Sequence, residues 1–111
     1  MHPDRPIVWL HGEITSPPLA AGARLETGNL LRLLQGGESL GMPWSRPMPA
    51  IGSRCHELRI VDRSASWRIV YRADPDAIVV VEVFRKTSRA TPGTVIRTCR
   101  QRLGRYDRMG G

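Results

Sequence analysis

The segment from Cys55 to Pro92 constrains the fold most, because it holds three strand-like runs joined by short polar turns. The runs cover about residues 54–62, 66–73 and 77–84, and the linkers DRSAS and ADPD are short enough for hairpins. We therefore expect an antiparallel meander. Arginines recur inside these runs, where apolar residues are the usual choice. Such arginines build a charged sheet surface, which suits a polyanion, and RNA is the leading candidate.

Strand alternation assigns a face to each of these charges. Leu58, Ile60, Ile69 and Tyr71 fit a core, so the polar side chains between them are expected on the opposite face. The third run is apolar on both faces, which is typical of a central strand, and Phe84-Arg85-Lys86 adds positive charge at its exit. The side chains expected to share one sheet face without a helix are Glu57, Arg59, Arg68, Arg72, Arg85 and Lys86.

Before the meander, residues from Arg5 to Leu10 resemble a first strand, and the loop at 11–18 ends in Ser16-Pro17-Pro18, a suitable helix start. An apolar stripe then predicts a helix from Leu19 to about Gln35. Gly22 and Gly28 weaken this helix by on the order of 1 kcal/mol each relative to alanine. The segment therefore forms either one helix or two shorter helices. The stripe consists of Leu19, Ala23, Leu30, Leu31 and Leu34.

Gly36 and Gly37 end this helix, and residues 36–53 have no periodicity, which predicts a loop packed against the body. A final helix is expected with Thr91 as its N-cap and Pro92 at its first position. Its apolar face comprises Val95, Ile96, Cys99, Leu103 and Tyr106.

These elements predict a single α+β domain over residues 1–111. We expect a small, antiparallel-rich twisted sheet of about four strands, an N-terminal helix or helix pair, and a C-terminal helix. Both helices are expected to cover one face of the sheet, which leaves the arginine-bearing face open.

The charge distribution supports a polyanionic partner. Residues 1–50 balance four arginines against four acids, whereas residues 51–111 carry the whole formal net charge of +7. Of the seventeen basic residues, sixteen are arginines, whose planar fork binds phosphate oxygens in a bidentate manner. An alternative explanation for the choice of arginine over lysine is a GC-rich genome, but genome bias does not move charge along a chain.

Other features exclude several classes. No apolar run is long enough to span a membrane, and the N-terminus has no secretory signal pattern, so a cytoplasmic location is expected. Cys55 and Cys99 are expected to be buried thiols. His2, His11 and His56 have no metal-ligand spacing, and no cofactor motif is present, so neither a metal nor a cofactor is expected.

Four stretches occur in an order that resembles the RelE/ParE superfamily of bacterial toxins, closest to its HigB-like, phage-derived branch of type II toxin–antitoxin systems. They are PPLAAGARLETGNLLRLLQGGESLGMP, HELR at 56–59, WRIVY at 67–71 and FRKTSRATP at 84–92. The similarity extends from Ile7 to Tyr106. It implies a RelE-like fold and a small endoribonuclease that cuts mRNA on the ribosome. It also implies a neutralising antitoxin encoded beside it, a helix-turn-helix protein with an acidic contact region.

Metal-free RNA cleavage uses the 2′-hydroxyl of the RNA as the nucleophile, and cationic side chains stabilise the added negative charge. By similarity, Arg68 is the main phosphate clamp and Arg59 supports it, while Arg85 and Lys86 hold the backbone or the leaving oxygen. Arg72 and Arg89 are further expected substrate contacts.

Three side chains are candidates for the group that transfers protons. His56 has the natural pKa for the role, but alternation places it on the core side. Glu57 lies on the expected face and is a second candidate. Tyr106 is a third, although the apolar stripe of the last helix claims it equally well.

Two other functions remain open as well. A ParE-type toxin shares the fold but poisons DNA gyrase without catalysis, and it has no need for a tight cationic cluster on the sheet. A catalytically silent prophage remnant that only binds nucleic acid or the antitoxin is the other alternative. Oligomeric state cannot be predicted from these patterns.

Overall fold

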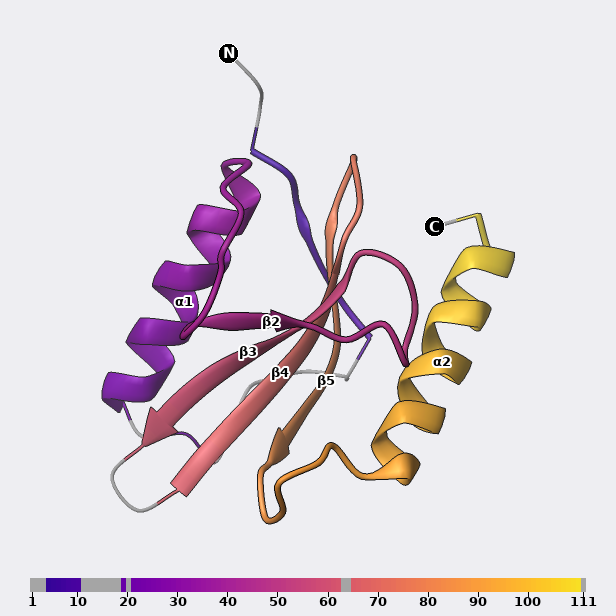
Figure 1. Cartoon of the computed structure of the whole chain (residues 1–111). Coiled ribbons are helices and arrows are strands. Elements are labelled where there is room, and N and C mark those ends of the chain that lie inside the picture. The colour runs from indigo at the N-terminus through magenta and orange to yellow at the C-terminus, as the bar shows by residue number, and fades with distance from the viewer. Residues whose placement is uncertain (1–3, 11–18, 20, 63–64, 111) are drawn as a thin grey trace.

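The computed structural model describes residues 4–10, 19, 21–62 and 65–110. Within these residues, five strands and two helices follow one another (Figure 1). The expected helix start at Ser16 and the tip of the first hairpin, residues 63–64, lie outside the described residues. The elements are β1 (Ile7–Trp9), α1 (Ala21–Gln35), β2 (Ser45–Pro47), β3 (Cys55–Asp62), β4 (Ala65–Ala73), β5 (Ile78–Arg85) and α2 (Gly93–Arg108).

The strands form one mixed sheet in the order β1-β5-β4-β3-β2. The predicted meander is confirmed, since β3 pairs antiparallel with β4 and β4 pairs antiparallel with β5. At one edge β1 runs parallel to β5, with Ile7 opposite Ile78. The α+β prediction is confirmed.

The sheet has one strand more than expected, because β2 lies inside the segment predicted to be a loop. It pairs antiparallel with β3 and places Ser45 opposite Leu58. The buried Ser45 hydroxyl also shares a hydrogen bond of 2.8 Å with the hydroxyl of Tyr71. A strand of three residues that ends in Pro47 is too short to show a period of two.

The expectation that both helices cover one face of the sheet is wrong. Helix α1 packs on one face, and α2 packs on the other (Figure 1). The reason lies in the central strands, which are apolar on both sides: Ile69 and Val80 face α1, whereas Val70 and Val79 face α2. A second apolar face must be covered, and the apolar stripe of α2 covers part of it.

Helix α1 is a single helix, so Gly22 and Gly28 do not divide it. Its predicted stripe is confirmed, and all five members lie in the core. The helix ends before Gly36 and Gly37, as predicted, and Gly37 adopts a positive φ of 98°.

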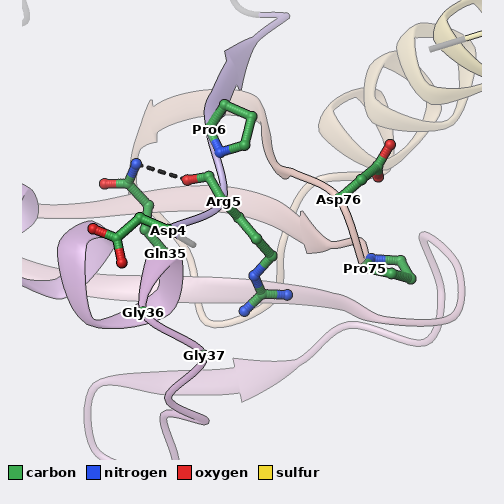
Figure 2. A pocket seen from close by; sticks show the side chains of 8 residues that line it. All are labelled: Asp4, Arg5, Pro6, Gln35, Gly36, Gly37, Pro75 and Asp76. Atoms are coloured by element: carbon green, nitrogen blue, oxygen red, sulfur yellow. Dashed lines mark hydrogen bonds between the residues drawn. The ribbon is translucent and has the colours of Figure 1, made fainter. Parts of the chain in front are cut away.

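Arg5 holds the C-terminal end of α1 against the sheet. Its guanidinium donates to the carbonyl oxygens of Leu34 at 2.6 Å and Asp74 at 2.8 Å, and Gln35 donates back to the carbonyl of Arg5 at 2.8 Å. Arg5 and Pro75 line an open hollow of about 600 Å³. Figure 2 shows the Arg5 guanidinium between the end of α1 and Pro75. Because the guanidinium already binds the carbonyl of Leu34 in the last turn of α1 and that of Asp74 between β4 and β5, we interpret Arg5 as a structural brace.

Helix α2 also has the predicted apolar face, with Cys99 and Leu103 buried. Its start differs from the prediction. Pro92 is the N-cap residue, its carbonyl accepts the backbone N–H groups of Val95 and Ile96, and Thr91 is not a cap. The Thr91 hydroxyl instead donates to Glu57 on β3.

A β-bulge in β5 determines which side chains reach the α2 face at its end. Val70 and Tyr71 are paired with Glu82 and Val80, so Val81 is an extra residue. Beyond the bulge the alternation is inverted, because a bulge turns the following side chains to the other face. Phe84 therefore lies opposite Arg68.

Candidate active site

Strands β2, β3 and β4 place four charged side chains on the α2 face of the sheet. Arg46 lies opposite Glu57, and Arg59 lies opposite Arg68. Directly opposed residues of antiparallel strands project from the same side of the sheet. The strand pairing therefore brings the two side chains of each pair close together. The prediction that Glu57, Arg59 and Arg68 share a face is confirmed.

Glu57 is the centre of this group and has no exposed surface. One carboxylate oxygen, Oε1, lies 3.4 Å from Arg46 Nη2 and 3.4 Å from Arg68 Nε. These are ion-pair distances, longer than the 2.7–2.9 Å or so of a direct charge-assisted hydrogen bond. The other oxygen accepts a hydrogen bond of 2.8 Å from the Thr91 hydroxyl. The buried carboxylate thus connects three strands to the segment that leads into α2.

Lys86 completes the group from the segment after β5. Its backbone N–H donates to the carbonyl of Ser66 at 2.8 Å, and its ammonium donates to the carbonyl of Arg89 at 2.7 Å. We call Arg46, Arg59, Arg68 and Lys86 the cation cluster. Arg46 and Arg68 contact the carboxylate of Glu57, while Arg59 and Lys86 interact electrostatically with the other members.

Burial and the neighbouring positive charges shift the pKa values of two members of the cluster. Burial lowers the pKa of Arg68, and the neighbouring Arg59 lowers it further, while Glu57 opposes both. Burial likewise lowers the pKa of Lys86, with the three arginines of the cluster adding to the effect and Glu57 opposing it. Both cations would therefore gain from a bound anion.

The members of the cluster differ in accessibility. Arg68 is only 5 % exposed and lies at the base, where it also donates to the carbonyl of Trp67 at 3.0 Å. The side chain of Arg46 is 39 % exposed, and Arg59 and Lys86 are half-buried. An anion from solvent can therefore contact Arg46, Arg59 and Lys86 more readily than the buried guanidinium of Arg68.

Arg85 does not join the cluster, although the sequence placed it there. It lies opposite Trp67, a member of the core on the α1 side. The bulge at Val81 is the physical reason, since without the extra residue Arg85 would share the face of Arg68. Arg89 stays next to the cluster through its carbonyl, and its side chain is exposed.

Arg72 lies on the same face but is occupied by two carboxylates. Its guanidinium donates to both oxygens of Asp74, at 2.7 and 2.9 Å, and to both oxygens of Asp107, at 2.7 and 3.0 Å. Arg54 also contacts Asp74, at 3.2 Å. This network fastens the C-terminal end of α2 to the sheet, and Tyr106 packs beside it with its ring centroid 6.0 Å from the guanidinium carbon of Arg72.

His56 lies on the α1 side, as alternation predicted. Its ring stacks on Tyr71, with centroids 5.4 Å apart, and Nδ1 lies 3.2 Å from the carbonyl oxygen of Arg54. Of the three proton-transfer candidates, Glu57 alone contacts members of the cluster in the described part of the chain.

Two residues of the site do not follow from the sequence patterns. Arg46 falls in a segment predicted to be a loop, and Thr91 is predicted to be a helix cap. For Arg46 the only available signal was its place in a segment that apolar residues were expected to pack against the body; Met48 and Ile51 do so, whereas Trp44 is exposed. Thr91 had no separate signal, because the same residue type before Pro92 is also the preferred N-cap.

Both cysteines are free and buried, as predicted. Burial raises the pKa of the Cys99 thiol to about 12 and also raises that of Cys55.

Among the described residues, no group of three His, Cys, Asp or Glu side chains is arranged to hold a metal ion. Neither α1 nor α2 is long and apolar enough to cross a membrane, and they are the helices of the described ranges.

The mixed five-strand sheet between two helices, with cations gathered on one face, is consistent with a RelE-like toxin fold. Residues 18–104 match the family of phage-derived Gp49-like proteins (DUF891), and the chain belongs to this family. The family is part of the RelE/HigB-like group of toxins from toxin–antitoxin pairs, which indicates a cognate antitoxin. No curated protein and no solved structure matches the chain.

Proposed function

We propose that this chain is a HigB-like mRNA endoribonuclease, with the cation cluster as its active site. The observation that carries the proposal is the convergence of four cations around one buried carboxylate, in a family of toxins. Burial lowers the pKa values of Arg68 and Lys86, and the neighbouring cations of the cluster lower them further. A bound phosphodiester counteracts these shifts, and it becomes more negative as the reaction proceeds.

The proposed reaction is an intramolecular transesterification of RNA. The 2′-hydroxyl gives up its proton to water, and its oxygen bonds to the adjacent phosphorus. The bond between phosphorus and the 5′ oxygen breaks, and that oxygen takes up a proton. The products are a 2′,3′-cyclic phosphate and a 5′-hydroxyl end.

Each member of the cluster has a proposed role that follows from its position. Arg46 and Arg59 bind the non-bridging phosphate oxygens from the exposed side, and Arg68 stabilises the phosphorane charge from beneath. Lys86, whose pKa is lowered, supplies the proton to the leaving 5′ oxygen. Glu57 is fully buried, and we assign it to positioning Arg46 and Arg68.

The proposed partners are the ribosome with its mRNA, and an antitoxin with an acidic contact surface. A chain with a formal net charge of +7 attracts both RNA and an acidic protein over long range. The association rate with either partner is therefore expected to fall as the salt concentration rises.

The test expresses the protein from a tightly repressed promoter and maps mRNA 5′ ends. The wild type is compared with Arg59→Ala and Arg68→Ala, and with Arg85→Ala as the matched control on the opposite face. Growth arrest with new cleavage sites in wild type and Arg85→Ala, but not in the two cluster variants, is the expected result. Because Arg68 is buried, circular dichroism must confirm that its variant folds, and the half-buried Arg59 gives a second, milder variant.

Two outcomes contradict the proposal. Arrest with intact mRNA and broken DNA would assign the chain to the gyrase-poisoning type. An absence of arrest, with folded protein present in the cells, would leave a binding module without catalytic activity.

A further inference from the structure

Two large apolar side chains lie exposed directly beside the cation cluster. Trp44 is 50 % exposed and Met42 is 57 % exposed. The guanidinium of Arg59 contacts the sulfur of Met42 at 3.7 Å, and the backbone N–H of Arg59 donates to the carbonyl of Trp44 at 2.8 Å. This hydrogen bond places Trp44 next to Arg59 along the edge of the sheet.

The pairing of β2 with β3 places Trp44 at the edge of the sheet. Ser45 lies opposite Leu58, and the hydrogen bond between Trp44 and Arg59 extends this register by one pair. Ser45 faces the α1 side, where it bonds Tyr71. Trp44 itself lies in the turn that follows Gly41, and its pairing with Arg59 places it at the same edge of the sheet as Arg46 and Arg59, beside the cation cluster.

The backbone that carries Trp44 is fixed at several points. The N–H groups of Trp44 and Ser45 both donate to the carbonyl of Gly41 at 3.1 Å, and the buried Ser45 hydroxyl bonds Tyr71 at 2.8 Å. An exposed aromatic ring on a fixed backbone is prepared to bind a flat partner, because little conformational entropy remains to be lost.

Sites for single-stranded nucleic acid combine a cationic path for the backbone with an aromatic ring on which a base stacks. The edge formed by Trp44, Arg46 and Arg59 has both components side by side. We propose that Trp44, with Met42 at its margin, stacks one base of a single-stranded RNA whose phosphate lies on the cation cluster. This inference rests on the proposed function, because it takes RNA as the polyanion.

The other two tryptophans provide contrast. Trp67 is 9 % exposed and belongs to the core on the α1 side. Trp9 is 42 % exposed, but it lies on β1 at the opposite edge of the sheet from β2. Trp9 is therefore a matched control, with similar exposure and a place at the other edge of the sheet from Arg46.

The test measures the affinity of purified protein for a 2′-O-methyl oligoribonucleotide of about 10 nucleotides, which blocks the attacking hydroxyl while keeping the bases. An abasic strand of equal length and charge is measured in parallel. Trp44→Ala is expected to weaken binding of the base-bearing strand by about 5- to 150-fold and to leave the abasic strand unchanged. Trp44→Phe retains most of the affinity, and Trp9→Ala behaves as wild type.

The inference is overturned if Trp44→Ala binds the base-bearing strand as wild type does, which would point to a protein partner for this ring. It is also overturned if the wild type does not prefer the base-bearing strand to the abasic one. Failure of the nuclease proposal has a different signature, namely no cleavage of unmodified, ribosome-bound mRNA by a wild type whose binding still depends on Trp44. Cleavage that depends on Arg59 but not on Trp44 would contradict the proposed stacking subsite and would still support the nuclease proposal.

Discussion

Glu57 holds together the charged side chains on which the proposed activity depends. Its carboxylate is fully buried among Arg46, Arg68 and Thr91, which come from three different parts of the chain. Removing one partner of a buried ion pair leaves the other charge without compensation, which is among the more damaging single changes to a fold.

We predict that Glu57→Gln lowers the free energy of unfolding by about 3 kcal/mol, because the amide keeps the shape but leaves Arg68 uncompensated. Denaturant unfolding measures the change. Glu38→Gln is the control, because Glu38 is exposed in the segment after α1. A loss below about 1 kcal/mol, the range of exposed ion pairs, would contradict the central place given to this carboxylate.

Lys86 offers a direct measurement of the electrostatics of the cluster. Its pKa is lowered by burial and by the three arginines, so the ammonium should lose its proton below the ordinary value of 10.5. As the pH rises, its contribution to anion binding should therefore disappear earlier than for a free lysine. Lys86 is the only lysine in the chain, so reductive ¹³C-methylation gives a single lysine signal for an NMR titration. A midpoint at or above that of a methylated free lysine would contradict the prediction.

At the scale of single residues, alternation along the strands predicted much of the site. It placed Arg59, Arg68 and Glu57 on one face and His56 on the other. It failed for Arg85, because a one-residue bulge at Val81 inverts the pattern and no residue type in that apolar run marks a bulge. Arg46 was missed because β2 is too short to show a period.

At the scale of elements, the two helices illustrate what a sequence pattern can and cannot give. The apolar stripes of α1 and α2 were both predicted and are both confirmed. The face of the sheet that each stripe covers could not be predicted, because periodicity describes a helix alone. The Val-rich run of β5 is apolar on both sides. This pattern indicates that each face of the sheet must be covered by another element.

Gly28 lies inside α1, and a methyl group added there would meet no atom within 4 Å. We predict that Gly28→Ala raises the free energy of unfolding by about 1 kcal/mol, since alanine is the better helix former. Gly37→Ala should have the opposite effect, because Gly37 has a φ of 98°, which side chains rarely adopt. Thermal unfolding of the two variants checks both signs, and an unchanged or lowered stability of Gly28→Ala would show that the helix resists the substitution.

At the scale of the whole molecule, the uneven charge of the sequence becomes a difference between the two sides of the fold. Helix α1 carries Arg24 and Arg32 against Glu26, whereas the exposed surface of α2 carries Arg97, Arg100, Arg105 and Arg108. The cation cluster lies on the α2 face as well, next to the segment that leads into that helix. The side that presents the proposed active site is thus also the strongly basic side, which would steer RNA toward it.

The most direct test of the central claim is the rate at which purified protein cleaves ribosome-bound mRNA. The opposite positions of Arg59 and Arg85 make the comparison sharp. Removing one preformed charge that stabilises the transition state typically slows a reaction by about 10²- to 10³-fold. We predict a loss of that size for Arg59→Ala, little change for Arg85→Ala, and products that end in a 2′,3′-cyclic phosphate. Equal rates for the two variants, or a larger loss for Arg85→Ala, would contradict the assignment of the active site to the cation cluster.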